Sequence, residues 1–195
     1  MVLSIGCHDT AVSNPPATET KPGSATTPVS ARMTIVREAD ALVVSWVVEN
    51  RTPAPIWVLD TVLAKQGSGW APSERAIVAR GEPGEARLVL GYLSPQSQMP
   101  QVEQGVARMI APIAIQLGAG ETRKGTVRVG LPIAPWHPYL EMASLKDPKR
   151  LVLRVGYLTK EPPWSDHAVP GGRVPELATV DAEQQWASSE SSPLP

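Results

Sequence analysis

The strongest constraint on the fold is an alternation of side chains between Ala41 and Ala64. Over residues 42–49 one face reads Leu, Val, Trp, Val, and the opposite face reads Val, Ser, Val, Glu. A period of two is typical of a β-strand that buries one face, whereas a helix would place polar residues every three to four positions. A turn at residues 51–54, which contains Pro53, separates this run from a second one at 56–64. The segment therefore predicts two adjacent antiparallel strands.

Short runs of the same kind recur along the chain, separated by turn signals such as Glu82-Pro83-Gly84-Glu85. The predicted strands are residues 33–38, 42–49, 56–64, 74–80, 87–93, 113–117, 122–131 and 150–158. No segment has the pattern of a long helix. About eight short strands predict an all-β, antiparallel β-sandwich, with a closed barrel as the alternative.

Two of these strands, 87–93 and 150–158, are similar to each other. Both begin with Arg-Leu-Val-Leu and end in Gly-Tyr-Leu. Aliphatic and β-branched residues are common in strands, so independent selection explains the similarity more simply than duplication does.

Composition suggests one domain with two tails. Residues 1–31 are predicted to be a disordered tether, 32–160 the β-sandwich, and 161–195 an irregular, proline-rich, acidic tail with at most a helical turn within 180–188. The body has 16 Lys or Arg against 11 Asp or Glu, and the tail has one against six. The net charge of −1 gives no bulk attraction to nucleic acid or to an anionic membrane.

Cys7 is the single cysteine, so the chain cannot form an internal disulfide. It follows Leu3-Ser4-Ile5-Gly6 and precedes a segment, 8–31, that is rich in Ser, Thr, Pro and Ala and lacks Leu, Ile and aromatic residues. Such a segment buries too little apolar surface to fold. This start resembles the lipidation site and tether of bacterial envelope lipoproteins. The resemblance implies a lipid on Cys7 and a location at the periplasm or outer membrane, and an ordinary disordered N-terminus is the alternative.

The segment Val44-Ser45-Trp46-Val47-Val48-Glu49-Asn50 resembles a strand of the immunoglobulin-like domains of bacterial envelope proteins. In those domains the strand delivers one Trp to the core between two sheets. The resemblance implies that Trp46 is buried in such a core. The Cys…Trp…Cys arrangement of true immunoglobulin domains is absent.

The candidate binding residues are aromatic and lie on stiff, proline-rich segments. They are Trp136, His137, Tyr139 and Trp164. Exposed Trp and Tyr on rigid loops bury a large area at little entropic cost, as a platform for a sugar ring or a peptide requires. The alternative is that these aromatics only cap one end of the sandwich. A soft-metal site from His137, His167, Asp166 and Met142 is a lesser possibility, and neither a metal nor a cofactor is predicted.

No catalytic motif is recognisable. The consecutive Ser165, Asp166 and His167 do not define a triad, because triad members meet through folding rather than through adjacency. Asn50-Arg51-Thr52 has the form of a glycosylation acceptor at a strand end. The sequence therefore predicts a non-enzymatic, envelope-tethered binding or assembly module whose loops or strand edges meet another envelope protein. A sugar- or metal-binding protein that uses the 136–139 loop is the alternative.

Overall fold

The computed structural model describes residues 27–94, 109–142 and 144–195. Cys7, nearly all of the predicted tether and most of the loop predicted after residue 94 lie outside the described residues. Within them the chain is mostly β, with a seven-residue helix, α2 (Leu177–Glu183).

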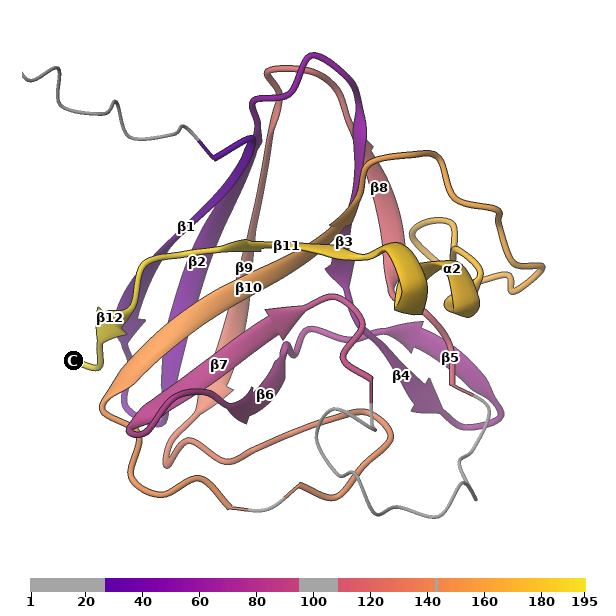
Figure 1. The fold of residues 1–195 in the computed structure, drawn as a ribbon. Coiled ribbons are helices and arrows are strands. Elements are labelled where there is room, and N and C mark those ends of the chain that lie inside the picture. Colours follow the sequence, from indigo (N-terminus) through magenta and orange to yellow (C-terminus); the bar gives the residue numbers. More distant parts are fainter. Residues whose placement is uncertain (1–26, 95–108, 143) are drawn as a thin grey trace, which may run out of the picture.

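Three groups of strands make up the fold (Figure 1). The small sheet has the antiparallel order β1-β2-β9, formed by β1 (Val29–Arg37), β2 (Ala41–Asn50) and β9 (Thr122–Gly130). The seven-stranded sheet contains β6 (Ile77–Arg80), β7 (Glu85–Leu90), β10 (Arg150–Leu158), β3 (Ile56–Thr61), β8 (Ile113–Leu117), β11 (Gln185–Ser188) and β12 (Ser192–Pro193). A separate hairpin joins β4 (Leu63–Gln66) and β5 (Gly69–Pro72).

The central strand β10 pairs along both of its edges. On one edge β7 runs parallel to residues 150–155, and β3 continues antiparallel to 156–158. On the other edge β11 pairs with 154–157 and β12 with 150–151. The parallel β7–β10 pair contradicts the expectation of a wholly antiparallel fold. It also makes the two similar segments neighbours, with Leu88 beside Leu153.

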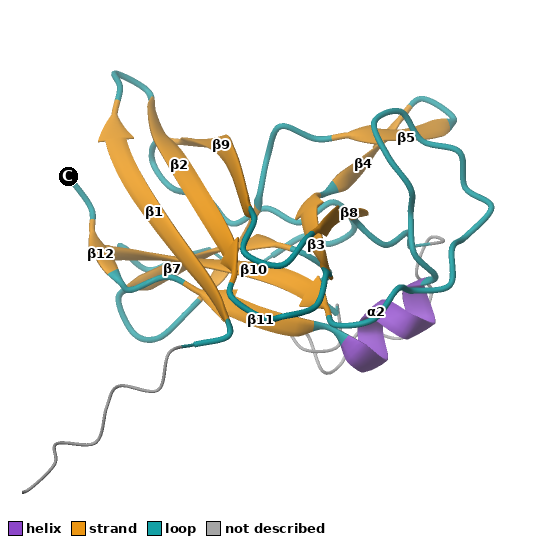
Figure 2. Ribbon diagram, turned by 90° about the horizontal axis from the view of Figure 1, so that it is seen from above, coloured by secondary structure: helices purple, strands orange, loops and turns teal. Residues whose placement is uncertain are grey.

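The two sheets pack face to face, and the strands of the small sheet run across those of the large one (Figure 2). Between them lies one continuous apolar cluster. It includes Leu42, Val44 and Trp46 from β2 and Leu88 and Leu153 from the large sheet. Trp46 is 4% exposed, which confirms that β2 delivers this indole to the core.

The large sheet has a second apolar cluster on its opposite face at β3. Ile56 and Val58 belong to the first cluster, whereas Trp57 and Leu59 belong to the second, together with Val180 of α2. A strand that is covered on both faces has no solvent side. This is why the β3 sequence is a nearly continuous apolar run rather than a strict alternation.

Both predicted domain limits need correction. The body begins earlier than residue 32, because β1 starts at Val29, and Val29 and Ala31 are buried in the first cluster. The segment 161–195 is not an irregular tail, because it contains α2, β11 and β12 and buries Val174, Val180 and Ala187. Its prolines fall outside α2 and β11, so they limit the length of the elements without preventing them.

Asn50 joins β2 to two turns. The side chain is buried, and Nδ2 donates to the carbonyl oxygens of Ala54, Leu117 and Gly118 at 2.9, 3.1 and 3.0 Å. Oδ1 accepts hydrogen bonds from the N–H and the hydroxyl of Thr52 at 3.0 and 2.7 Å. The nitrogen that a glycan would modify is therefore enclosed and fully hydrogen-bonded in the folded chain.

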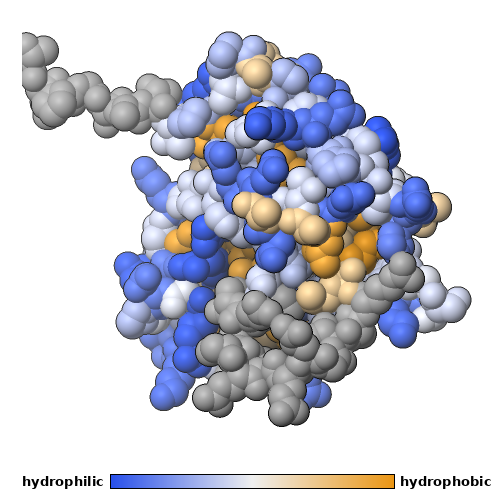
Figure 3. Space-filling model, turned by 45° about the vertical axis from the view of Figure 1, so that its right-hand side comes forward, coloured by the Kyte–Doolittle hydropathy of each residue, from blue (hydrophilic) through white to orange (hydrophobic). Residues whose placement is uncertain are grey.

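The molecular surface is mixed in character. Hydrophilic side chains cover most of the face in Figure 3, with small apolar areas between them. In the described part of the chain, Val36 on β1 is the one large hydrophobic side chain that is exposed, at 57%.

Candidate functional site

Trp136 is fixed against β6 rather than displayed to solvent. Its backbone N–H and C=O exchange hydrogen bonds with Val78 at 3.0 and 2.9 Å. The guanidinium carbon of Arg75 lies 4.4 Å from the centroid of the indole ring, a cation–π distance. The ring also packs against the core.

His137 and Tyr139 satisfy each other and the backbone. His137 Nδ1 accepts a hydrogen bond from the Tyr139 N–H at 3.2 Å, so the proton sits on Nε2, which donates to the Leu93 carbonyl at 3.2 Å. The Tyr139 hydroxyl donates to the Ile110 carbonyl at 2.9 Å and accepts from the Ile110 N–H at 3.2 Å. Burial raises the pKa of Tyr139 to about 12. Both side chains hold the 136–139 loop on the body.

His137 makes stability pH-dependent. Burial lowers its pKa below the ordinary 6.5, although its hydrogen bond to the Leu93 carbonyl opposes this. On acidification the unfolded chain therefore takes up a proton before the folded chain does, and stability falls as pH drops below 6.5. We expect urea denaturation to show a loss of up to about 1 kcal/mol between pH 7.5 and 5.5. His137→Asn, which keeps an acceptor for the Tyr139 N–H, should flatten this slope, and an unchanged slope would contradict the assignment.

Trp164 lies in a different environment. Its Nε1 donates to the Glu161 carboxylate at 3.0 Å, and the guanidinium carbon of Arg173 lies 3.9 Å from its ring centroid. The four predicted binding residues are thus not brought together as one platform.

No group of three potential His, Cys, Asp or Glu metal ligands occurs among the described residues. Ser165 and His167 make a local contact, with Oγ and Nδ1 3.3 Å apart.

A more open site lies along β9, the last strand of the small sheet. Among the described strands β9 pairs with β2 alone. The Asn50 N–H donates to the Glu121 carbonyl, and the Leu131 N–H donates to the Asp40 carbonyl, at the two ends of this ladder. Hydrogen bonding alternates along an antiparallel pair, so odd-numbered residues of β9 bond to β2. The even-numbered residues between them direct their N–H and C=O groups to the open edge.

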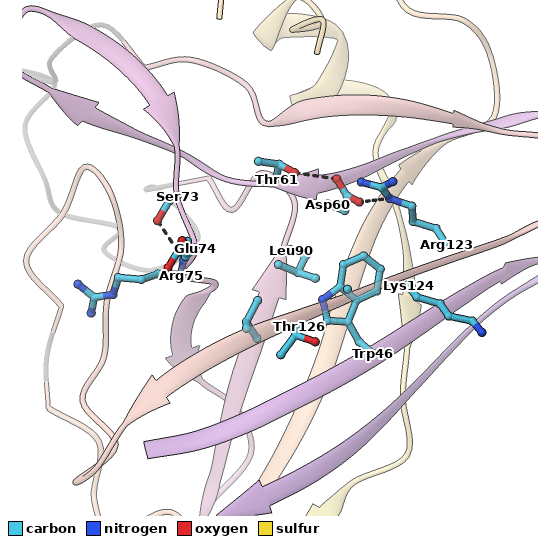
Figure 4. A pocket seen from close by; sticks show the side chains of 12 residues that line it. Trp46, Asp60, Thr61, Ser73, Glu74, Arg75, Leu90, Arg123, Lys124 and Thr126 are labelled. Atoms are coloured by element: carbon cyan, nitrogen blue, oxygen red, sulfur yellow. Dashed lines mark hydrogen bonds and ion pairs between the residues drawn. The ribbon is translucent and has the colours of Figure 1, made fainter. Parts of the chain in front are cut away.

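One recess beside this edge surrounds the indole of Trp46 and has a volume of about 190 Å³. Its walls are residues 46, 60, 61, 73–75, 90 and 123–127 (Figure 4). Trp46 lies across from Gly125, and a Cβ at Gly125 would come within 2.3 Å of the ring. The indole Nε1 is buried and has no hydrogen-bond partner within the described chain. An unpaired buried donor is uncommon and calls for a physical explanation.

The same recess contains a buried acid. The Asp60 side chain is 2% exposed, and Oδ2 accepts from Arg123 Nε at 2.6 Å, while Oδ1 accepts from the Thr61 hydroxyl at 2.9 Å. Figure 4 shows Asp60 and Arg123 facing each other, with Trp46 on the other side of the recess. Arg123 uses only Nε in this pair, and its two η nitrogens meet no acceptor in the described part of the chain.

A second recess of about 160 Å³ continues along β9. Arg75 lines both recesses, and the second is otherwise mostly apolar, with walls from residues 76, 78, 128–132 and 134. We call the two recesses together the β9 groove. Its lining residues include Arg75, Arg123, Lys124, Arg128, Asp60 and Glu74. The side chains of Lys124 and Arg128 lie on the exposed face of β9, so Arg75 and Arg123 are the cations on the groove side. The β9 groove therefore favours an extended, acidic or neutral occupant.

A larger recess, about 420 Å³, lies at the C-terminal end of the chain between Leu42, Leu131, Leu145 and Leu194. There Arg37 Nη1 donates to the Pro195 oxygen at 2.9 Å. Its walls include no buried polar atom without a partner among the described residues. It gives less indication of a ligand than the β9 groove does.

The residues of the β9 groove were not predicted as a site from the sequence. Asp60 was the available signal, since it is a carboxylate at the end of an apolar strand and a buried acid needs a partner.

The helix of the described residues is too short to cross a membrane. In comparisons with known proteins, the chain matches no family model, no curated protein and no solved structure.

Proposed function

We propose that this protein is a non-enzymatic binding module that accepts an extended segment of another envelope protein as an added strand on β9. Strand addition uses main-chain hydrogen bonds for affinity and pockets for alternate side chains for specificity. The observation that carries the proposal is the nine-residue edge of β9, which pairs with no other described strand than β2 and lies beside two recesses.

The geometry of β9 suits a new partner strand. Lys124, Thr126 and Arg128 direct their backbone groups outward, as the hydrogen-bond pattern of the β2–β9 ladder requires. Their side chains lie on the exposed face, whereas Val127 and Val129 point into the core.

Two features from the sequence complete the proposal. The module is an immunoglobulin-like domain, supported by the two packed sheets and the buried Trp46, although the parallel β7–β10 pair departs from the arrangement expected. It is attached to the cell envelope through a lipid on Cys7, a feature that rests on the N-terminal sequence alone. The sugar- or metal-binding alternative has less support, since the polar groups of His137 and Tyr139 bond within the chain.

Thr126→Pro tests strand addition at β9. Proline removes the outward N–H of residue 126 and leaves the ladder to β2 intact, as it does on natural edge strands. The probe is a phage-displayed library of random nine-residue peptides, panned on the full 195-residue chain. Synthetic copies of the enriched peptides should bind Thr126→Pro at least about tenfold more weakly than the parent, a loss of one edge hydrogen bond or more.

The matched control is Thr126→Val, which keeps the N–H and should bind normally. Hydrogen exchange on the unmodified chain gives an independent readout, because bound peptide should protect the amides of Lys124, Thr126 and Arg128. An absence of enriched peptides, or peptides that protect only amides elsewhere, would overturn the proposal.

A further inference from the structure

We infer that the strand accepted by β9 carries a carboxylate side chain opposite Gly125 and a small apolar side chain four residues away, opposite Val129. This inference rests on the proposed function and specifies the chemistry of the partner segment. It follows from what each end of the β9 groove offers.

The spacing comes from strand geometry. Side chains of an added strand that lie opposite odd-numbered residues of β9 point, like those residues, toward the large sheet. Gly125 lines the recess at Trp46, and Val129 lines the apolar recess. Four strand residues span about 13 Å, so one extended segment reaches both recesses with side chains at positions i and i+4.

The recess at Trp46 selects an acceptor with negative charge. Trp46 Nε1 has no partner, and the η nitrogens of Arg123 are unused within the described residues. Asp60 is already neutralised by Arg123. A carboxylate accepts hydrogen bonds from all of these donors and offers none of its own. Gly125 lets the indole lie directly against β9, since a Cβ there would come within 2.3 Å of the ring, and this places Nε1 beside the strand.

The other recess selects a small apolar side chain. Its walls are largely Ala76, Val78, Val129, Pro132 and Ala134. A volume of about 160 Å³ is enough for a side chain such as valine. Arg128 lies at the rim, but its guanidinium is engaged by Glu38 and Asp40 on the exposed face. Charge recognition is thus concentrated at the Trp46 end.

Synthetic peptides test this directly. The parent probe is Ser-Thr-Glu-Thr-Val-Thr-Val-Thr-Ser, whose Glu and second Val are four residues apart, together with its reversed sequence for the opposite strand direction. Gln and Ala replace the Glu in two further pairs. The Glu peptide, in its better-binding direction, should bind the full chain about tenfold more tightly than the Ala peptide, with Gln between them, because hydrogen bonds to charged groups are the stronger ones.

Trp46→Phe is the decisive variant. It removes the unpaired Nε1 donor and retains a smaller aromatic ring, so no hydrogen bond is lost, and any loss of packing should affect the Glu and Ala peptides alike. It should weaken the Glu peptide about tenfold and leave the Ala peptide nearly unchanged. A purely structural role for Trp46 would affect both peptides equally.

The outcomes separate the two proposals. Equal binding of the Glu, Gln and Ala peptides, or an equal effect of Trp46→Phe on all of them, overturns the carboxylate inference and leaves strand addition intact. Library peptides that bind at β9 without an acidic residue opposite Gly125 do the same. If neither the library nor these peptides bind at β9, both proposals fail.

Discussion

Asn50→Asp should destabilise the fold by about 3 kcal/mol or more, because it places an oxygen where the buried Nδ2 now donates to three carbonyl groups. The substitution keeps size and shape, but it replaces the donor by an oxygen of a carboxyl group, which carries negative charge when ionised. The loss should appear as a lower midpoint of urea denaturation with an unchanged m value.

Thr52→Val is the matched control for Asn50. It removes the hydroxyl hydrogen bonds to Asn50 Oδ1 and to the Ala54 carbonyl, both 2.7 Å, but leaves every Nδ2 bond in place. Its effect should be about 1 kcal/mol. If Asn50→Asp costs no more than Thr52→Val, then the three Nδ2 hydrogen bonds of Asn50 do not stabilise the fold as proposed.

Gly156→Ala should cost about 2–3 kcal/mol, as overpacking of a closely fitted site does. Gly91 and Gly156 lie side by side, and the Gln184 side chain covers both. Gln184 Oε1 accepts from the Tyr92 N–H at 2.8 Å, and Nε2 donates to the Tyr92 carbonyl at 2.8 Å. A Cβ at Gly156 would lie 2.5 Å from Oε1, so the amide must leave both bonds. Thermal or urea unfolding measures the loss.

A double-mutant cycle with Gln184→Ala establishes the cause. Once the Gln184 amide is absent, Gly156→Ala has less to displace, so the two losses should add to clearly more than the loss in the double variant. Simple additivity would show that the glycine is required for a reason other than Gln184.

The strands could be predicted from the sequence because a half-buried strand shows its period of two directly. The predicted ranges 113–117 and 150–158 coincide with β8 and β10, and 42–49 lies within β2. The strand predicted over 56–64 is divided between β3 and β4, since its apolar residues serve two clusters.

Strand partners were harder to predict than strands. The parallel pairing of β7 with β10 joins segments about 65 positions apart, and nothing in their local sequence encodes direction. The C-terminal elements were missed because β11 has only four residues and β12 only two, too short for a periodic signal. Proline and glycine in 161–176 dominated that interpretation.

The candidate site was hard to predict for the same reason, because its residues come together only through long-range contacts. Aromatic residues on proline-rich loops were predicted as binding residues. In the folded chain, however, the His137 and Tyr139 side chains point inward and donate hydrogen bonds to the backbone carbonyls of Leu93 and Ile110. The β9 groove depends on the pairing of Trp46 with Gly125 and of Asp60 with Arg123, 63 positions apart. These long-range contacts depend on how the strands are connected and paired. The alternation of side chains along one strand gives no information about that topology.

The last strands carry a consequence for biosynthesis. Because β11 closes one edge of β10 near Gly156, this edge lacks a partner until residues 185–188 have been synthesised and have left the ribosome, although β7 and β3 can already pair with the other edge. Until then this edge of β10 is open to other chains, so chaperone protection of the polypeptide matters most in the interval before β11 docks. A truncation after Glu183, which removes β11 and β12, would leave this exposure permanent.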